Sequence, residues 1–133
     1  MSDNGKTAIV TGSARGIGAA VAERLGKDGF AVVVNYSGSA ADAEAEVAKI
    51  KDAGARAIAA RADVSDPAAV KRLFDEATAA FGGVDVLVNN AGVMLLSTIA
   101  EADDKLFDRQ VAINLKGVFN GMREAARLSL IHI

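Results

Sequence analysis

Residues 11–18 have the sequence Thr-Gly-Ser-Ala-Arg-Gly-Ile-Gly, and they constrain the fold more than any other stretch. They follow a short apolar run at 7–10 and precede a helical pattern that begins near Ile17. Glycines in a strand-to-helix turn let the backbone approach a ligand where a Cβ atom would collide. The following helix offers unpaired N–H groups and the positive end of its dipole to an anion. Gly12, Gly16 and Gly18 therefore predict a cradle for the pyrophosphate of a dinucleotide.

The rest of the chain repeats strand-and-helix units of similar length. Helix-ending glycines at 29, 54 and 82 recur every 25 to 28 residues. The expected strands are residues 7–11, 31–35, 55–62 and 84–88. The expected helices are residues 16–27, 40–53, 67–81 and a stretch from Asp103 or Asp104 to Arg127. This order predicts an α/β protein of the Rossmann type, with a doubly wound parallel sheet of about four strands between two helix layers.

Composition excludes several classes of partner. The chain has 133 residues, enough for one domain, and a net charge of −2 with acids and bases interspersed. We therefore expect neither nucleic acid nor an anionic membrane as a partner. The absence of cysteine removes thiolate metal sites, and no metal is predicted. The N-terminus lacks the apolar core of a signal peptide, and no apolar run approaches the roughly 18 residues of a membrane span, so a cytoplasmic protein is expected.

One polar residue interrupts an apolar stripe on the last predicted helix. Phe107, Val111, Asn114 and Val118 fall at helical spacing, which predicts that all four face inward. A buried asparagine amide must find hydrogen-bond partners. Asn114 is therefore either a structural link between the helix and the sheet or a residue that faces a site.

Taken together, four motifs resemble those of the short-chain dehydrogenase/reductase family. They are the glycine turn at 11–18, Ala-Asp-Val at 62–64, Asn-Asn-Ala-Gly at 89–92 and Asn114, and the resemblance covers residues 6–127. Within the family, the chain is most similar to the 3-oxoacyl-carrier-protein reductase and glucose 1-dehydrogenase-like branch.

The resemblance implies a role for each motif. The cofactor would lie over the turn formed by Gly12, Ser13, Gly16, Ile17 and Gly18. The Asp63 carboxylate would accept from the adenine amino group, while the Val64 amide contacts the ring. Asn114 would be the active-site asparagine, whose backbone carbonyl holds a water molecule in a proton relay. Asn89 would stabilise the central strands, and the ribose would lie beside Asn90, Ala91 and Gly92.

The end of the second predicted strand bears on the choice of cofactor. NAD-specific proteins of this fold place an acid there to bind the ribose 2′-hydroxyl. This chain has no acid until Asp42; its polar candidates are Asn35, Tyr36, Ser37 and Ser39. Hydroxyls and amides can donate to a 2′-phosphate, and Arg15 can supply the compensating charge, although it is also compatible with a solvated surface position. NADP(H) is therefore expected rather than NAD(H).

The catalytic serine, tyrosine and lysine of the family lie beyond the helix that carries Asn114. The one tyrosine here, Tyr36, is not followed by a lysine four residues later. Residues 128–133 (LSLIHI) match a translation of a widely used transposase sequencing adapter. We therefore expect residues 1–127 to be the N-terminal cofactor-binding part of one domain and residues 128–133 to be a non-native tail, with a native amphipathic tail as the alternative. The fourth strand would then be a long exposed apolar edge prone to aggregation.

Two classes of function remain open. The first is an NADP(H)-dependent oxidoreductase that interconverts a carbonyl and a secondary alcohol of a small-molecule substrate. This chain would be one part of that enzyme and would be inactive by itself. The second is a non-catalytic nucleotide-binding or regulatory module on the same fold. A sugar-nucleotide enzyme is disfavoured, because those proteins usually have a Gly-x-x-Gly-x-x-Gly turn. Full-length members of the resembled family are commonly homotetramers packed through the helix bearing Asn114 and the next helix.

Overall fold

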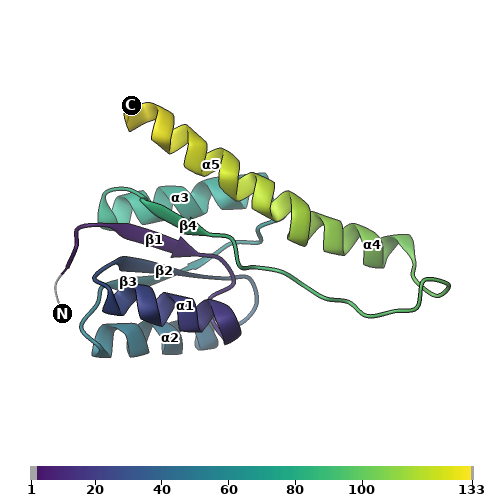
Figure 1. The fold of residues 1–133 in the computed structure, drawn as a ribbon, viewed down its shortest axis with the longest axis horizontal. Helices are drawn as coiled ribbons and strands as arrows, with labels where there is room; N and C mark the ends of the chain where they lie inside the picture. Colours follow the sequence, from purple (N-terminus) through teal and green to yellow (C-terminus); the bar gives the residue numbers. More distant parts are fainter. Residues whose placement is uncertain (1–2, 133) are drawn as a thin grey trace.

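The computed structural model describes residues 3–132, which form a four-stranded parallel sheet with helices on both faces (Figure 1). The strand order is β3-β2-β1-β4. The chain therefore adds β2 and β3 on one side of β1 and then crosses back to add β4 on the other side. Ile9 of β1 lies opposite both Val33 of β2 and Leu87 of β4. The strands are β1 (Thr7–Val10), β2 (Ala31–Tyr36), β3 (Ala57–Arg61) and β4 (Val86–Val88). The predicted α/β fold with a Rossmann-type parallel sheet is confirmed.

Helices cover both faces of the sheet, and capping residues mark both ends of one of them. One face of the sheet is covered by α1 (Gly16–Lys27) and α2 (Ala40–Asp52), and the other by α3 (Pro67–Phe81) and α5 (Gly117–His132) (Figure 1). The Asp66 carboxylate accepts from the Ala68 N–H at the start of α3, with Pro67 in the first turn. Gly82 ends α3 with φ of +90°, a conformation that glycine adopts without strain.

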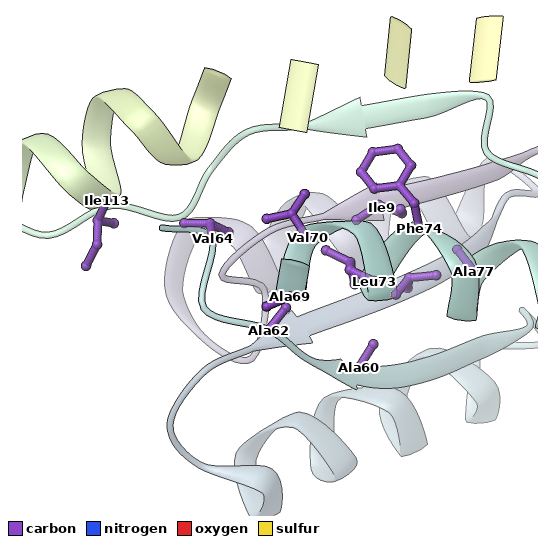
Figure 2. Packing of buried hydrophobic residues seen from close by; sticks show 11 residues of the cluster. Ile9, Ala60, Ala62, Val64, Ala69, Val70, Leu73, Phe74, Ala77 and Ile113 are labelled. Carbon is purple, nitrogen blue, oxygen red and sulfur yellow. The ribbon is translucent and has the colours of Figure 1, made fainter. Parts of the chain in front are cut away.

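Apolar side chains from the sheet fill two cores, one on each face. Ile9 and Val33 pack with α3 through Leu73 and Phe74 (Figure 2). On the opposite face, residues of β1 and β2 pack with Ala22, Ala43, Val47 and Ile50. Because both faces are covered, β1 and β2 are continuously apolar along most of their length, as expected for buried parallel strands.

The large apolar side chain of Ile17, near the start of α1, does not pack into the core. That side chain is 78% exposed, whereas the buried positions of α1 are the small residues Gly18, Ala19, Ala22 and Gly26. A Cβ atom on Gly26 would lie 3.1 Å from Ile50 Cγ2. The helix packs too close to its neighbours for a large side chain at these positions.

The last helical stretch is one long helix with a π-helical segment in its middle, hereafter the long helix. It comprises α4 (Asp104–Gln110), η1 (Val111–Lys116) and α5. The predicted inward stripe of Phe107, Val111, Asn114 and Val118 is wrong, since Phe107 is 63% exposed and Asn114 is also exposed. The inward positions are instead mostly small or polar: Ile113, Gly117, Asn120, Gly121 and Glu124.

The edge at β4 is shorter than predicted. β4 has three residues, all half-buried, and Leu87 packs against the core shared with α3. α5 continues as a helix to His132, whereas the side chains of residues 130–133 and the backbone of residue 133 lie outside the described structure. The predicted origin of residues 128–133 stays a prediction. Within residues 3–132, no helix has the length and apolar character needed to cross a membrane.

Candidate functional site

The N-terminus of α1 differs from the other helix starts. Its N-cap residue, Arg15, has an extended backbone, and no side chain among the described residues caps the helix. By contrast, Ser39, Asp66 and Asp103 cap α2, α3 and α4. The first-turn N–H groups of a helix have no acceptor within the helix itself. At α1 these groups are therefore available to an anionic ligand.

Two glycines of the turn are required by close packing. Gly12 has φ of +62°, and a Cβ atom there would lie 2.9 Å from Ala91 Cα. A Cβ atom on Gly18 would collide with the Gly12 carbonyl oxygen and lie 2.5 Å from Asn90 Nδ2. Gly16 has φ of +65°, which non-glycine residues rarely adopt. The turn and the start of α1 thus form a backbone-lined cradle that fits a pyrophosphate group.

Side chains from neighbouring strands hold the cradle in place. Asn90 Nδ2 donates to the carbonyl oxygens of Thr11 and Gly12, at 3.1 Å each. Thr11 Oγ1 accepts from the backbone N–H groups of Asn90 and Ala91, at 3.0 Å each. The segment after β4 is therefore fastened to the segment after β1, and Asn90 supports the turn with both hydrogens of its amide.

Two residues that were predicted to bind the cofactor, Asn35 and Ser13, instead use their side chains to support the cradle. Asn35 is buried; its Oδ1 accepts from the Gly12 N–H at 3.0 Å, and its Nδ2 donates to the carbonyl oxygens of Ala60 and Ala62. The buried Ser13 hydroxyl donates to the Val10 carbonyl oxygen at 2.7 Å. These polar side chains are committed to the protein, so donation to a 2′-phosphate would have to come from Tyr36, Ser37 and Ser39 among the predicted neighbours.

A cavity of about 400 Å³ opens at the carboxyl ends of the strands, where ligands bind in open α/β sheets. The structure brings most of the predicted residues to its wall: Gly12, Arg15, Asn35, Tyr36, Ser37, Ser39, Asp63, Val64, Asn90, Ala91 and Gly92. Five predicted residues lie outside this wall: Ser13, Gly16, Ile17, Gly18 and Asn114.

The cavity wall also contains residues that the sequence analysis did not select. Asp42 lies there from the first turn of α2, and its backbone N–H donates to Ser39 Oγ at 3.1 Å. Arg109 and Ile113 reach the wall from the long helix. Because Asp42 follows the end of β2 closely in the sequence, its place on the cavity wall could have been predicted. Nothing in the sequence pairs Arg109 with this edge of the sheet.

The Asp63 carboxylate is held in its ionised form. Ser65 donates to Asp63 Oδ1 through its hydroxyl at 2.6 Å and its backbone N–H at 3.0 Å. Arg109 Nη1 lies 3.6 Å from Asp63 Oδ2. The Ser65 hydroxyl bond is the largest cause of a lowered Asp63 pKa, and the Arg109 charge adds to it. A carboxylate in this state is a hydrogen-bond acceptor, as an adenine amino group requires.

Asn114 lies within the π-helical segment and fastens it to the loop after β4. Its Nδ2 donates to the Val93 carbonyl oxygen at 2.7 Å, and its Oδ1 accepts from the Val93 N–H at 2.8 Å. Gly92 is packed against the same amide, since a Cβ atom there would lie 3.2 Å from Asn114 Oδ1. Single π-helical turns are frequent at functional sites. Asn114 therefore sets the position of the long helix relative to the wall that carries Ala91 and Gly92.

The chain is similar to proteins of one family over nearly its whole length. The short chain dehydrogenase model matches residues 6–131. The short chain dehydrogenase claC of Passalora fulva is 48% identical over 124 residues, which is 93% of this chain and 46% of the relative. Versicolorin reductase stcU of Emericella nidulans is 45% identical over 124 residues, covering 93% of this chain and 47% of the relative.

Solved structures give the same result. A short chain dehydrogenase from Burkholderia cenocepacia in complex with NADP superposes with a TM-score of 0.90 at 44% identity, covering 93% of this chain and 51% of that one. The chain thus spans about half the length of the relatives that it matches. A family model that matches residues 6–131, together with the predicted parallel sheet, shows that the chain belongs to the short-chain dehydrogenase/reductase family.

Proposed function

We propose that this chain forms the N-terminal, NADP(H)-binding part of an oxidoreductase that interconverts a carbonyl and a secondary alcohol of a small-molecule substrate. One observation carries the proposal. Arg15, at the uncapped start of α1, lines the same cavity as the ionised Asp63 carboxylate, which supports binding of a pyrophosphate and an adenine at the two ends of one ligand. The bound cofactor would supply or accept the hydride.

The residues of this chain would bind and orient the cofactor. The turn containing Gly12 and Gly18 and the first N–H groups of α1 would hold the pyrophosphate. Asp63 would accept from the adenine amino group, with the Val64 amide facing the ring. Asn114, fixed by its two hydrogen bonds to Val93, would present its backbone carbonyl to a water molecule of the proton relay.

The preference for NADP(H) rests on the charges at the cavity wall. Arg15 can pair with a 2′-phosphate, and the Tyr36 and Ser37 hydroxyls can donate to it. The Asp42 carboxylate on the same wall opposes a phosphate and reduces the expected preference. The relative from Burkholderia cenocepacia, which was solved with NADP, supports this choice.

We also propose that the full-length protein is a homotetramer, with the outer face of α4, η1 and α5 at a subunit interface. Large apolar side chains lie exposed along this face at helical spacing: Phe107, Val111, Leu115, Phe119 and Met122. An exposed apolar patch of this kind is typical of a protein–protein interface.

Binding of NADPH to the 133-residue chain tests the proposed cofactor site. Gly18→Ala places a methyl group against Gly12 and Asn90, and we expect it to weaken binding at least about tenfold. Gly83→Ala is the control, because a Cβ atom there meets no described atom within 4 Å. The change in NADPH fluorescence gives the affinity, and circular dichroism checks folding. Equal affinities for the two variants would contradict the cradle.

Catalysis is tested separately, because the sequence contains no Tyr-x-x-x-Lys motif. We propose that the 133-residue chain binds NADPH without carbonyl-dependent oxidation. Turnover by this chain that Asn114→Ala abolishes would contradict the proposal of inactivity. The complete coding sequence settles the choice between an enzyme and a non-catalytic module. A serine followed about 13 residues later by Tyr-x-x-x-Lys supports the enzyme.

A further inference from the structure

Asn120 on α5 is a fully buried polar residue that reaches the Asp63–Val64 segment. Its Nδ2 donates to the Val64 carbonyl oxygen at 2.8 Å, although the two residues are 56 positions apart in the sequence. Its Oδ1 accepts from Arg123 Nη2 at 3.1 Å. Because Arg123 can only donate, it fixes the orientation of the amide, with the nitrogen toward Val64.

The long helix also packs directly against the Val64 side chain. A Cβ atom on Gly117 would lie 2.6 Å from Val64 Cγ2, so only glycine permits this approach. Ile113, one turn earlier, belongs to the same buried cluster as Val64 (Figure 2). Helix packing thus brings Asn120 to the Val64 backbone and leaves little room for the segment to shift.

The peptide group between Val64 and Ser65 is held at both ends. Its carbonyl oxygen accepts from Asn120, and its N–H donates to Asp63 Oδ1 at 3.0 Å. Rotation of this peptide plane would break both bonds together. The Asn120 amide therefore fixes the peptide plane that follows Val64 and donates to the Asp63 carboxylate, and Asp63 and Val64 both line the cavity.

We propose that Asn120 is a positioning residue for adenine recognition: it sets the Val64–Ser65 peptide so that Asp63 and the Val64 amide match the edge of the adenine ring. This inference rests on the proposed cofactor site. It predicts that Asn120 controls discrimination between adenine and related bases, beyond any contribution to the stability of the fold.

The test compares NADP⁺ with deamino-NADP⁺, in which a carbonyl replaces the adenine amino group. The native 133-residue chain should prefer NADP⁺, because Asp63 accepts from an amino group but repels a carbonyl oxygen. Asn120→Asp keeps the size of the side chain and an acceptor for Arg123, yet sets a carboxylate against the Val64 carbonyl. We expect it to reduce the preference about fivefold, the size of one hydrogen bond.

Glu124→Gln is the matched control, a carboxyl-to-amide exchange on the same helix. Glu124 is also buried, and its Oε1 accepts from Arg127 Nη1 at 2.8 Å. It should change thermal stability without changing the ratio of the two affinities. Calorimetric titration gives both affinities, and thermal unfolding reports on the fold.

The outcomes separate the two proposals. If the native chain binds neither dinucleotide, the proposed cofactor site fails, and this inference with it. If the native chain prefers NADP⁺ and Asn120→Asp weakens both ligands in parallel, Asn120 is only structural and the inference is wrong. Should Asn120→Asp not fold, the native chain answers the question by NMR. The Asn120 side-chain amide resonance should shift with NADP⁺ more than with deamino-NADP⁺, and equal shifts would overturn the inference.

Discussion

Ser13 and Asn35 are joined by two reciprocal hydrogen bonds. These bonds lie just after Val10 and Val34, the last residues that pair β1 with β2. The Ser13 N–H donates to the Asn35 carbonyl oxygen at 2.9 Å, and the Asn35 N–H donates to Ser13 Oγ at 3.1 Å. The chain thereby continues the pairing of the two strands into the glycine turn. The shape of the cradle is thus set in part by buried polar groups whose hydrogen bonds are made within the protein.

Replacing the Asn35 side chain should therefore loosen the cradle and the fold together. Asn35→Ala removes the acceptor for the Gly12 N–H and the donor for two carbonyl oxygens, all at a buried position. We expect a loss of about 3 kcal/mol in the free energy of unfolding, because buried polar groups are left unpaired. Urea denaturation measures this loss. Ser37→Ala, at an exposed position on the same wall, should change stability by less than about 0.5 kcal/mol.

Local signals predicted the elements well because each signal acts within a few residues. Asp66 and Pro67 mark the start of α3 through a cap and a fixed φ angle, and both functions depend only on the adjacent backbone. The apolar runs at β1 and β2 predicted a sheet buried on both faces. The carboxyl ends of those strands then had to meet at one edge, which gathered most of the predicted site.

The facing of the helices could not be predicted in the same way. Phe107 was expected to point inward, yet it is exposed, and close packing at Gly117 on the same long helix leaves room only for a hydrogen atom. Whether a helix packs this closely depends on its partner, which periodicity does not contain. The approach of Arg109 to Asp63 has the same origin, because it requires the long helix to lie across the sheet edge.

Two of the charged residues at the cavity wall, Arg15 and Asp42, should set the choice between NADP⁺ and NAD⁺. Arg15→Gln should weaken NADP⁺ binding about tenfold and NAD⁺ binding much less, since only NADP⁺ carries the 2′-phosphate. Asp42→Asn should strengthen NADP⁺ binding by removing a repulsive carboxylate. Fluorescence titrations in low salt measure both effects, and the Arg15 effect should shrink as salt is added. An unchanged ratio in both variants would rule out this wall as the 2′-phosphate site.

The lowered Asp63 pKa should depend more on Ser65 than on Arg109. The Ser65 hydroxyl bond is the largest cause of the shift, so Ser65→Ala should raise the Asp63 pKa more than Arg109→Met does. Ser65→Thr keeps the hydroxyl and should restore the native value. A ¹³C carboxyl NMR titration measures all four chains. Because the folded pKa lies below the unfolded value, the stabilising contribution is present above that unfolded value and is lost as the pH falls through the folded pKa.

Glu46 should destabilise the fold at neutral pH. It is 6% exposed, its Oε1 has no partner among the described residues, and burial followed by the Glu23 charge raises its pKa above 4.5. With the folded pKa above the unfolded value, its contribution to stability is fully present below about pH 4.5 and is lost as the pH rises through the folded pKa. Glu46→Gln should therefore raise the free energy of unfolding at pH 7 by about 1 kcal/mol.

Denaturation at several pH values checks this expectation for Glu46. The gain from Glu46→Gln should disappear toward pH 4, where the native side chain is protonated. Glu44→Gln, at an exposed position on the same helix, is the control and should show little change across the range. A gain that persists unchanged at low pH would point to packing rather than to the buried charge.

The exposed apolar face of the long helix should make the 133-residue chain associate with itself. Phe119 is 56% exposed and Met122 is 59% exposed on this face, and their burial in an oligomer is favourable. Phe119→Glu should shift the chain toward the monomer in light scattering after size-exclusion chromatography. Arg72→Glu, which changes charge at an exposed position of α3, should leave the oligomeric state as it is. A native chain that stays monomeric at high concentration would remove the support that this face gives to the proposed tetramer.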